Sequence, residues 1–84
     1  MQVYWIKFAP IAQPCAENLG VGVTAWDDED ARRLALQAFS DREVASVTVV
    51  NDVRTLDEGH VRPTMGNIFA RGIWWPSGYE WAGR

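Results

Sequence analysis

The first third of the chain contains two stretches whose composition and alternation are typical of β-strands. Residues 3–9 (VYWIKFA) are rich in β-branched and aromatic side chains, and residues 19–26 (LGVGVTAW) alternate between two faces. We predict a strand over each stretch. Between them, Pro10 and Pro14 indicate a loop. One face of the second strand holds Val21, Val23 and Ala25. The other face holds glycines beside Thr24, so a large side chain or another backbone is expected to lie close to it.

After the second strand the hydrophobic period changes to that of a helix. Asp27 or Asp28 is a good N-cap residue. Glu29 and Asp30 place negative charge in the first turn, where the helix dipole favours it. The apolar stripe follows the i, i+3, i+4, i+7 spacing through Ala31, Leu34, Ala35, Ala38 and Phe39. The small side chains in this stripe would let the helix lie close to a sheet, and we expect the helix to end near Ser40.

Two later apolar stretches complete the pattern. Residues 43–53 (EVASVTVVNDV) and 68–75 (IFARGIWW) are predicted as the third and fourth strands, and Pro76 closes the last one. The element order is then ββαββ in a single domain of residues 1–84. We expect an α+β fold in which one helix packs on one face of a small four-stranded, mostly antiparallel sheet. A helix of about 12 residues is only ~18 Å long. The opposite sheet face must therefore meet water, the tryptophan-rich tail or another subunit.

Charge and cysteine content exclude several classes of function. The 84 residues carry a net charge of −3, and Lys7 is the single lysine, so a nucleic-acid partner is not expected. The lone Cys15 cannot form an internal disulfide or a cysteine-based metal site. The start of the chain lacks the pattern of a secretory signal, and no apolar run approaches the ~20 residues of a membrane helix. We expect a cytoplasmic protein that uses neither a membrane nor a cofactor.

The titratable residues do not form a recognisable catalytic motif. His60 is the only histidine, and no serine lies in the glycine pattern of a nucleophile elbow, so the favoured interpretation is a histidine that serves a loop. The acidic run at 27–30 lacks the glycine and the distal glutamate of a calcium loop, and helix capping explains it. We predict no catalytic residue and no metal site.

Residues 60–81 form the densest part of the chain. This stretch holds the only histidine, two arginines and three of the five tryptophans. The predicted strand at 68–75 is apolar on both faces, with Trp74 on one and Trp75 on the other, so it is expected to be buried on both sides. Two interpretations stay open. The strand fills a small core, or it forms part of an interface, because arginine and tryptophan are enriched among interface hot spots.

The motifs LDEGHVRPTMG and RGIWWP resemble a pattern in small bacterial proteins of no assigned activity. Those proteins share a helix begun by an acidic cap and a C-terminal Arg-Gly-aromatic-Trp/Tyr-Pro strand. The resemblance covers residues 21–76. In size, acidity and single-domain build, the chain is also similar to bacterial immunity proteins, which bind and block a cognate toxin. This second resemblance implies a protein partner.

The leading hypothesis is a non-enzymatic protein-binding module, most concretely an immunity-type inhibitor of a bacterial toxin. Its predicted binding residues are His60, Arg62, Asn67, Arg71, Trp74, Trp75 and Tyr79. The alternative is a small homo-oligomeric ligand-binding protein or enzyme, with an anion site between subunits around His60, Arg62 and Arg71. A structural subunit of a larger assembly is a third possibility. We expect a protein partner, a homodimer or both.

Overall fold

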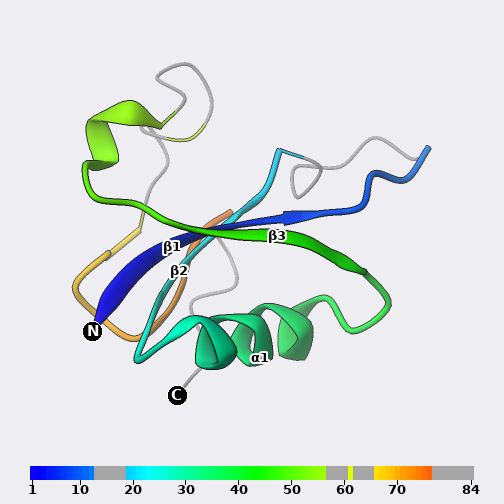
Figure 1. The fold of residues 1–84 in the computed structure, drawn as a ribbon, viewed down its shortest axis with the longest axis horizontal. Coiled ribbons are helices and arrows are strands. Elements are labelled where there is room, and N and C mark those ends of the chain that lie inside the picture. The colour runs from blue at the N-terminus through cyan, green and yellow to red at the C-terminus, as the bar shows by residue number, and fades with distance from the viewer. Residues whose placement is uncertain (13–18, 57–60, 62–65, 77–84) are drawn as a thin grey trace.

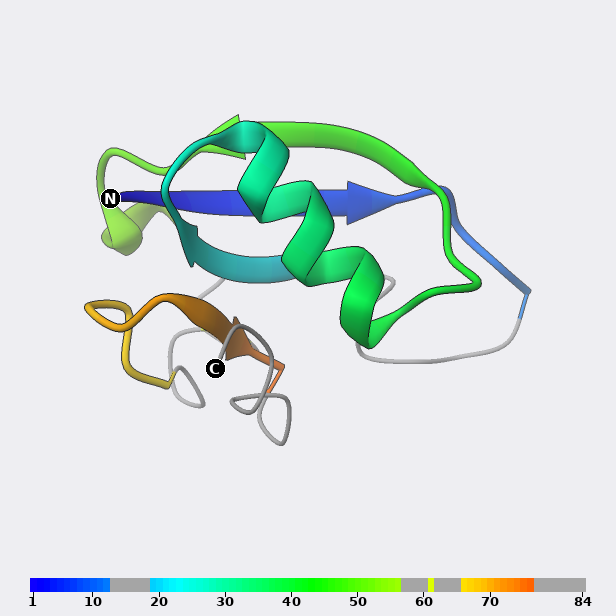
Figure 2. The same ribbon diagram turned by 90° about the horizontal axis from the view of Figure 1, so that it is seen from below.

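The computed structural model describes residues 1–12, 19–56, 61 and 66–76. In chain order its elements are β1 (Gln2–Phe8), β2 (Val21–Ala25), α1 (Asp28–Ala38), β3 (Val44–Val49), the short 3-10 helix η2 (Val53–Thr55) and β4 (Gly72–Trp75). The strands form one sheet in the order β3-β1-β2-β4, and every neighbouring pair is antiparallel. Helix α1 lies across one face of this sheet (Figures 1 and 2). The predicted α+β fold, with one helix on a four-stranded sheet, is confirmed.

Helix α1 begins where its cap was expected. The Asp27 carboxylate accepts a hydrogen bond of 2.8 Å from the backbone N–H of Asp30, which satisfies one of the donors that a helix start leaves without a partner. The stripe predicted from the sequence faces the sheet. With strand residues it forms the first core cluster, which contains Tyr4, Ile6, Phe8, Val21, Val23, Ala25, Ala31, Leu34, Ala35, Phe39 and Ile73. At 11 residues α1 is short, and no helix in the described part of the chain could span a bilayer.

A second cluster covers the sheet face opposite the helix. Its buried members are Val61, Trp74 and Trp75, and Val3, Trp5, Leu56 and Ile68 pack against them. The glycines of β2 make room for this layer, as the sequence predicted. A Cβ atom on Gly22 would overlap the ring of Trp74, and one on Gly20 would overlap the indole of Trp5. The face that one helix could not cover is therefore filled largely by this chain's own tryptophans.

The third strand ends earlier than predicted. It was expected over 43–53, but β3 stops at Val49 and the chain then turns into η2. The side chain of Asp52 accepts a hydrogen bond from the backbone N–H of Arg54. The carbonyl of Asp52 accepts two more from Thr55, one from its N–H and one from its hydroxyl. These local bonds favour a turn over a strand, and they override the apolar pattern that Val53 continues.

The fourth strand begins later than predicted, at Gly72 and not at residue 68. A break in register sets its geometry, because Val23 pairs with Ile73 while Gly22 pairs with Trp75. Trp74 is thus the extra residue of a β-bulge. The predicted alternation placed Trp74 and Trp75 on opposite faces, and this is wrong, since both belong to the second cluster. Ile73 alone packs in the cluster on the helix side.

Candidate functional site

Four of the seven predicted binding residues lie in the described part of the chain: Asn67, Arg71, Trp74 and Trp75. The other three, His60, Arg62 and Tyr79, lie outside the described residues. The described four do not form one surface. Trp74 and Trp75 are buried, whereas Asn67 and Arg71 lie in the segment that leads into β4.

Arg71 joins the start of β4 to the first turn of α1. Its Nη2 lies 2.6 Å from Oδ1 of Asp30 and its Nε lies 3.0 Å from Oδ2, so both nitrogens donate to the same carboxylate. Oδ2 also accepts a hydrogen bond of 3.0 Å from the backbone N–H of Trp26. Arg33 donates to Oδ1 over a longer 3.4 Å. Asp30 therefore connects the end of β2, the helix and the start of β4.

The environment of Asp30 stabilises its charged form. Arg71 donates hydrogen bonds to the buried carboxylate and lowers its pKa from 3.8 to about 2, against the opposing effect of burial. The same hydrogen bonds raise the pKa of Arg71. In the sequence, Asp30 is explained by the helix dipole alone. Its position four residues before Leu34, on the edge of the buried stripe, was the signal that it faces the protein interior.

Two aromatic side chains project into solvent near this ion pair. Trp26 is 66% exposed and Phe69 is 85% exposed, and we call these two residues the aromatic rim. Trp26 is tied to Asp30 through its backbone, and Phe69 lies two residues before Arg71. The loop that carries Phe69 is fixed at two further points. Asn67 Oδ1 accepts a bond of 2.9 Å from the Phe69 N–H, and the carbonyl of Ile68 accepts one of 2.6 Å from the hydroxyl of Thr24.

Asn67 thus acts on the rim through the backbone. Its side chain closes an Asx turn directly before residue 68, where the strand was predicted to begin. Neither rim residue was among the predicted binding residues. Trp26 and Phe69 fall within the ranges predicted as strands, 19–26 and 68–75, and no local pattern marks either side chain as exposed.

Trp74 and Trp75 belong to the core of the single chain. They are 1% and 4% exposed, and both rings pack on Trp5, with ring centres 6.1 Å and 5.6 Å away. The Nε1 atom of Trp74 is buried and has no hydrogen-bond partner among the described residues. Of the two interpretations left open for this strand, the structure supports the core. Neither side chain is available to a partner unless the second cluster opens.

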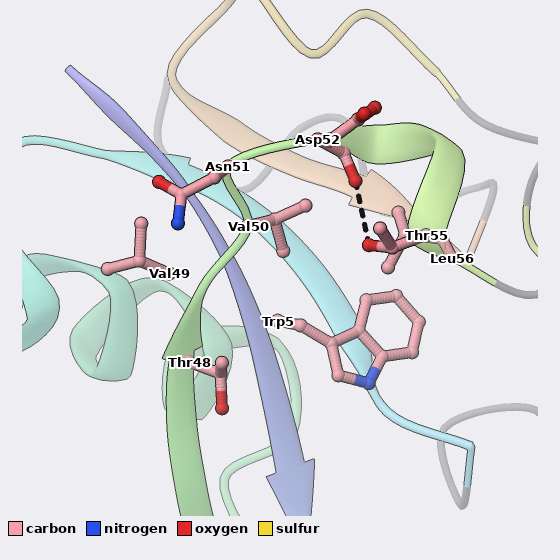
Figure 3. A pocket seen from close by; sticks show the side chains of 8 residues that line it. All are labelled: Trp5, Thr48, Val49, Val50, Asn51, Asp52, Thr55 and Leu56. Carbon is pink, nitrogen blue, oxygen red and sulfur yellow. Dashed lines mark hydrogen bonds between the residues drawn. The ribbon is translucent and has the colours of Figure 1, made fainter.

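Two hollows flank Trp5 on the face opposite the helix. The first, about 370 Å³ in volume, lies between β3 and η2 (Figure 3). Its walls include Trp5, Val50 and Leu56, with Thr48, Asn51 and Thr55 as polar neighbours. The second, about 350 Å³, lies on the Lys7 side of the same indole. Both volumes fall within the range of small-ligand pockets.

Among the described residues, no three histidine, cysteine, aspartate or glutamate side chains lie close enough together to hold a metal ion. Comparisons with protein-family models, with curated proteins and with solved structures find no match for this chain.

Proposed function

We propose that this protein is a non-enzymatic binding module of the cytoplasm that engages a protein partner through the aromatic rim. An immunity-type inhibitor that blocks a toxin is its most concrete form. The observation that carries the proposal is the exposure of Trp26 and Phe69, which belong to the two segments that the Asp30–Arg71 ion pair joins. Large aromatic side chains held in solvent on fixed backbone lose little conformational entropy when a partner covers them.

The charge around the rim favours a basic partner. Asp27, Asp28 and Glu29 follow Trp26 directly and are exposed, and the chain as a whole carries a net charge of −3. A lysine or arginine of the partner could lie over the Trp26 ring while it pairs with these carboxylates. Arg71, two residues after Phe69, is held in place because its guanidinium is bound to Asp30.

The experiment is affinity capture from the native host with three forms of the protein. These are the natural sequence, the Trp26→Ser/Phe69→Ser double variant, and Leu19→Ser as the control. Leu19 is also an exposed apolar residue, but it lies two residues before β2, at the opposite end of that strand from Trp26. A stoichiometric partner that the natural and control forms retain and the double variant loses would support the proposal. Equal capture by all three forms would contradict it.

A small ligand-binding protein is the second candidate, and the hollow beside Trp5 favours it. The alternative predicted from the sequence was an anion site between subunits, around His60, Arg62 and Arg71. Arg71 already donates to Asp30 through two nitrogens, which offsets its charge. Planar ligands that stack on Trp5 and bond to Thr55 or Asn51 fit the described residues better.

Thermal melting against a panel of small anions and planar metabolites tests this second candidate. A ligand at 100 times its Kd should add about 2.7 kcal/mol of stability. Thr48→Trp would partly fill the hollow and should abolish the stabilisation by a ligand bound there. The absence of any shift across the panel would contradict the ligand-binding candidate and leave the protein-binding proposal untouched.

A further inference from the structure

Strand β3 has an edge that pairs with no other described strand. It is the first strand in the order β3-β1-β2-β4 and bonds only to β1. The backbone N–H of Val50 donates to the carbonyl of Val3 over 2.8 Å, and Val49 lies opposite Tyr4 in the next pair. Backbone groups in an antiparallel strand point alternately to the two sides. The N–H and C=O groups of Val49 and Val47 therefore point away from β1, toward the open edge.

The opposite edge of the sheet is protected, whereas no strand of the described part of the chain pairs with the edge of β3. On β4 the carbonyl of Trp74 accepts a bond of 2.7 Å from the Gly66 N–H, the strand is only four residues long, and Pro76 follows it. Strand β3 has the sequence VASVTV, without a charged residue or a proline. Its one irregularity is a bulge near its start, which leaves the last four residues regular. Edges of this kind pair readily with another strand.

An apolar flank accompanies the open edge. Val49 is 43% exposed on the helix side of β3. Val47, which shares this face, is partly buried and packs against the first core cluster. A strand added to this edge would cover the exposed part of Val49.

We propose that the occupant of this edge is a second copy of the chain. Two β3 strands would pair antiparallel about a twofold axis perpendicular to the sheet and form one continuous eight-stranded sheet. This operation keeps both helices on the same face, and it places Val49 of each copy on the helix side of the joined sheet. The contact is isologous, so a charged residue on β3 would lie near the same charged residue of the other copy. The six residues of β3 carry no charge, which is the composition that self-pairing needs.

The dimer edge and the aromatic rim are different surfaces. The rim lies beside the ion pair that joins α1 to β4, whereas β3 is the strand at the far edge of the sheet. A dimer would therefore present two rims, and partner capture by the rim does not depend on the dimer. The proposed dimer can fail while the proposed function holds, and the reverse is also possible.

The test measures mass in solution by light scattering for the full chain and two variants at Val49. Val49→Pro removes an outward N–H without removing a bond to β1, and proline is tolerated on edge strands. Val49→Thr is the matched control, because it keeps both the β-branch and the backbone donor. We expect the natural chain and Val49→Thr to have twice the 9.5 kDa mass of one copy, and Val49→Pro to have the mass of a single copy.

Hydrogen exchange identifies the surface and covers the case in which Val49→Pro fails to fold. In the natural chain the amide of Val47 should exchange at least about tenfold more slowly than an amide of an open edge. A single-copy mass at all concentrations would overturn the proposal. A dimer that persists in folded Val49→Pro, or a dimer whose Val47 amide exchanges rapidly, would place the contact elsewhere and would also overturn it.

Discussion

Asp30 and Arg71 lie 41 residues apart in the chain and form a two-bonded ion pair that joins the first turn of α1 to the start of β4. The pair also fixes the backbone of Trp26, because Asp30 Oδ2 accepts from both partners. The pair therefore acts together with the Asn67 and Thr24 hydrogen bonds, which fix the loop of Phe69. The placement of the rim segments depends in part on this carboxylate.

Replacing Asp30 tests this dependence. We expect Asp30→Asn to lower the free energy of unfolding by about 2–4 kcal/mol, since it leaves buried hydrogen-bond donors poorly satisfied. Urea denaturation measures this loss. Asp52→Asn is the matched control, because Asp52 pairs with Arg54 over 2.8 Å at an exposed position. The control should lose clearly less, and equal losses would show that burial of the pair does not matter.

The low pKa of Asp30 predicts an acid-sensitive fold. The pKa is about 2 in the folded chain against 3.8 for an ordinary aspartate, so the unfolded state binds its proton first as pH falls. The stabilisation, roughly 2–2.5 kcal/mol, is fully present above about pH 5 and is lost as the pH falls from about 5 to below 2. Unfolding free energies measured across this range should show the loss in the natural chain. Asp30→Asn should show a flatter profile there, and an unchanged profile would contradict the assignment.

The contact between Gly22 and Trp74 should not tolerate a methyl group. Gly22→Ala would push a Cβ into the indole ring, and overpacking of this kind costs about 1–3 kcal/mol. Combination with Trp74→Leu, which removes the ring, should recover part of the loss. A double-mutant cycle by urea unfolding should therefore give a favourable coupling energy. Strict additivity of the two changes would show that the ring does not lie over Gly22.

Replacing a buried aromatic side chain should lower the free energy of unfolding far more than replacing an exposed one. Trp75→Ala empties part of the second cluster and should cost about 3–5 kcal/mol, enough to unfold a domain of this size. Phe69→Ala, at an exposed position, should change stability by no more than about 0.5 kcal/mol. Circular dichroism and thermal melting of the two variants provide the comparison. A folded Trp75→Ala protein that loses a binding partner would restore the interface interpretation of β4.

Much of the fold could be read from local patterns. The cap at Asp27, the stripe around Leu34 and the alternation of β2 each concern residues within a few positions of one another, and each is confirmed. Such features depend on backbone period and on hydrogen bonds between neighbours in the chain, so the sequence shows them directly. The close approach at Gly22 was also expected, although the identity of its neighbour Trp74 was not.

The candidate site was predicted less well. Arg71 and Asn67 were named as binding residues, and this stays a prediction; in the structure Arg71 bonds to Asp30 and Asn67 bonds to the backbone of Phe69. Trp74 and Trp75 were named and are core residues. His60, Arg62 and Tyr79 stay predictions. The rim residues were missed because the sequence alone does not distinguish an exposed aromatic side chain from a buried one. Only the neighbours of that side chain in the folded structure do so.

The amino-acid pattern alone established one capped helix, the two N-terminal strands and the presence of two later apolar segments that complete an α+β sheet. The packed structure decided the strand order, the bulge at Trp74, the covering of the second face and the pairing of Asp30 with Arg71. The physical reason is the range of the interactions. Periodicity and capping act within one or two turns of chain, whereas register, bulges and buried ion pairs form only between segments that folding brings together.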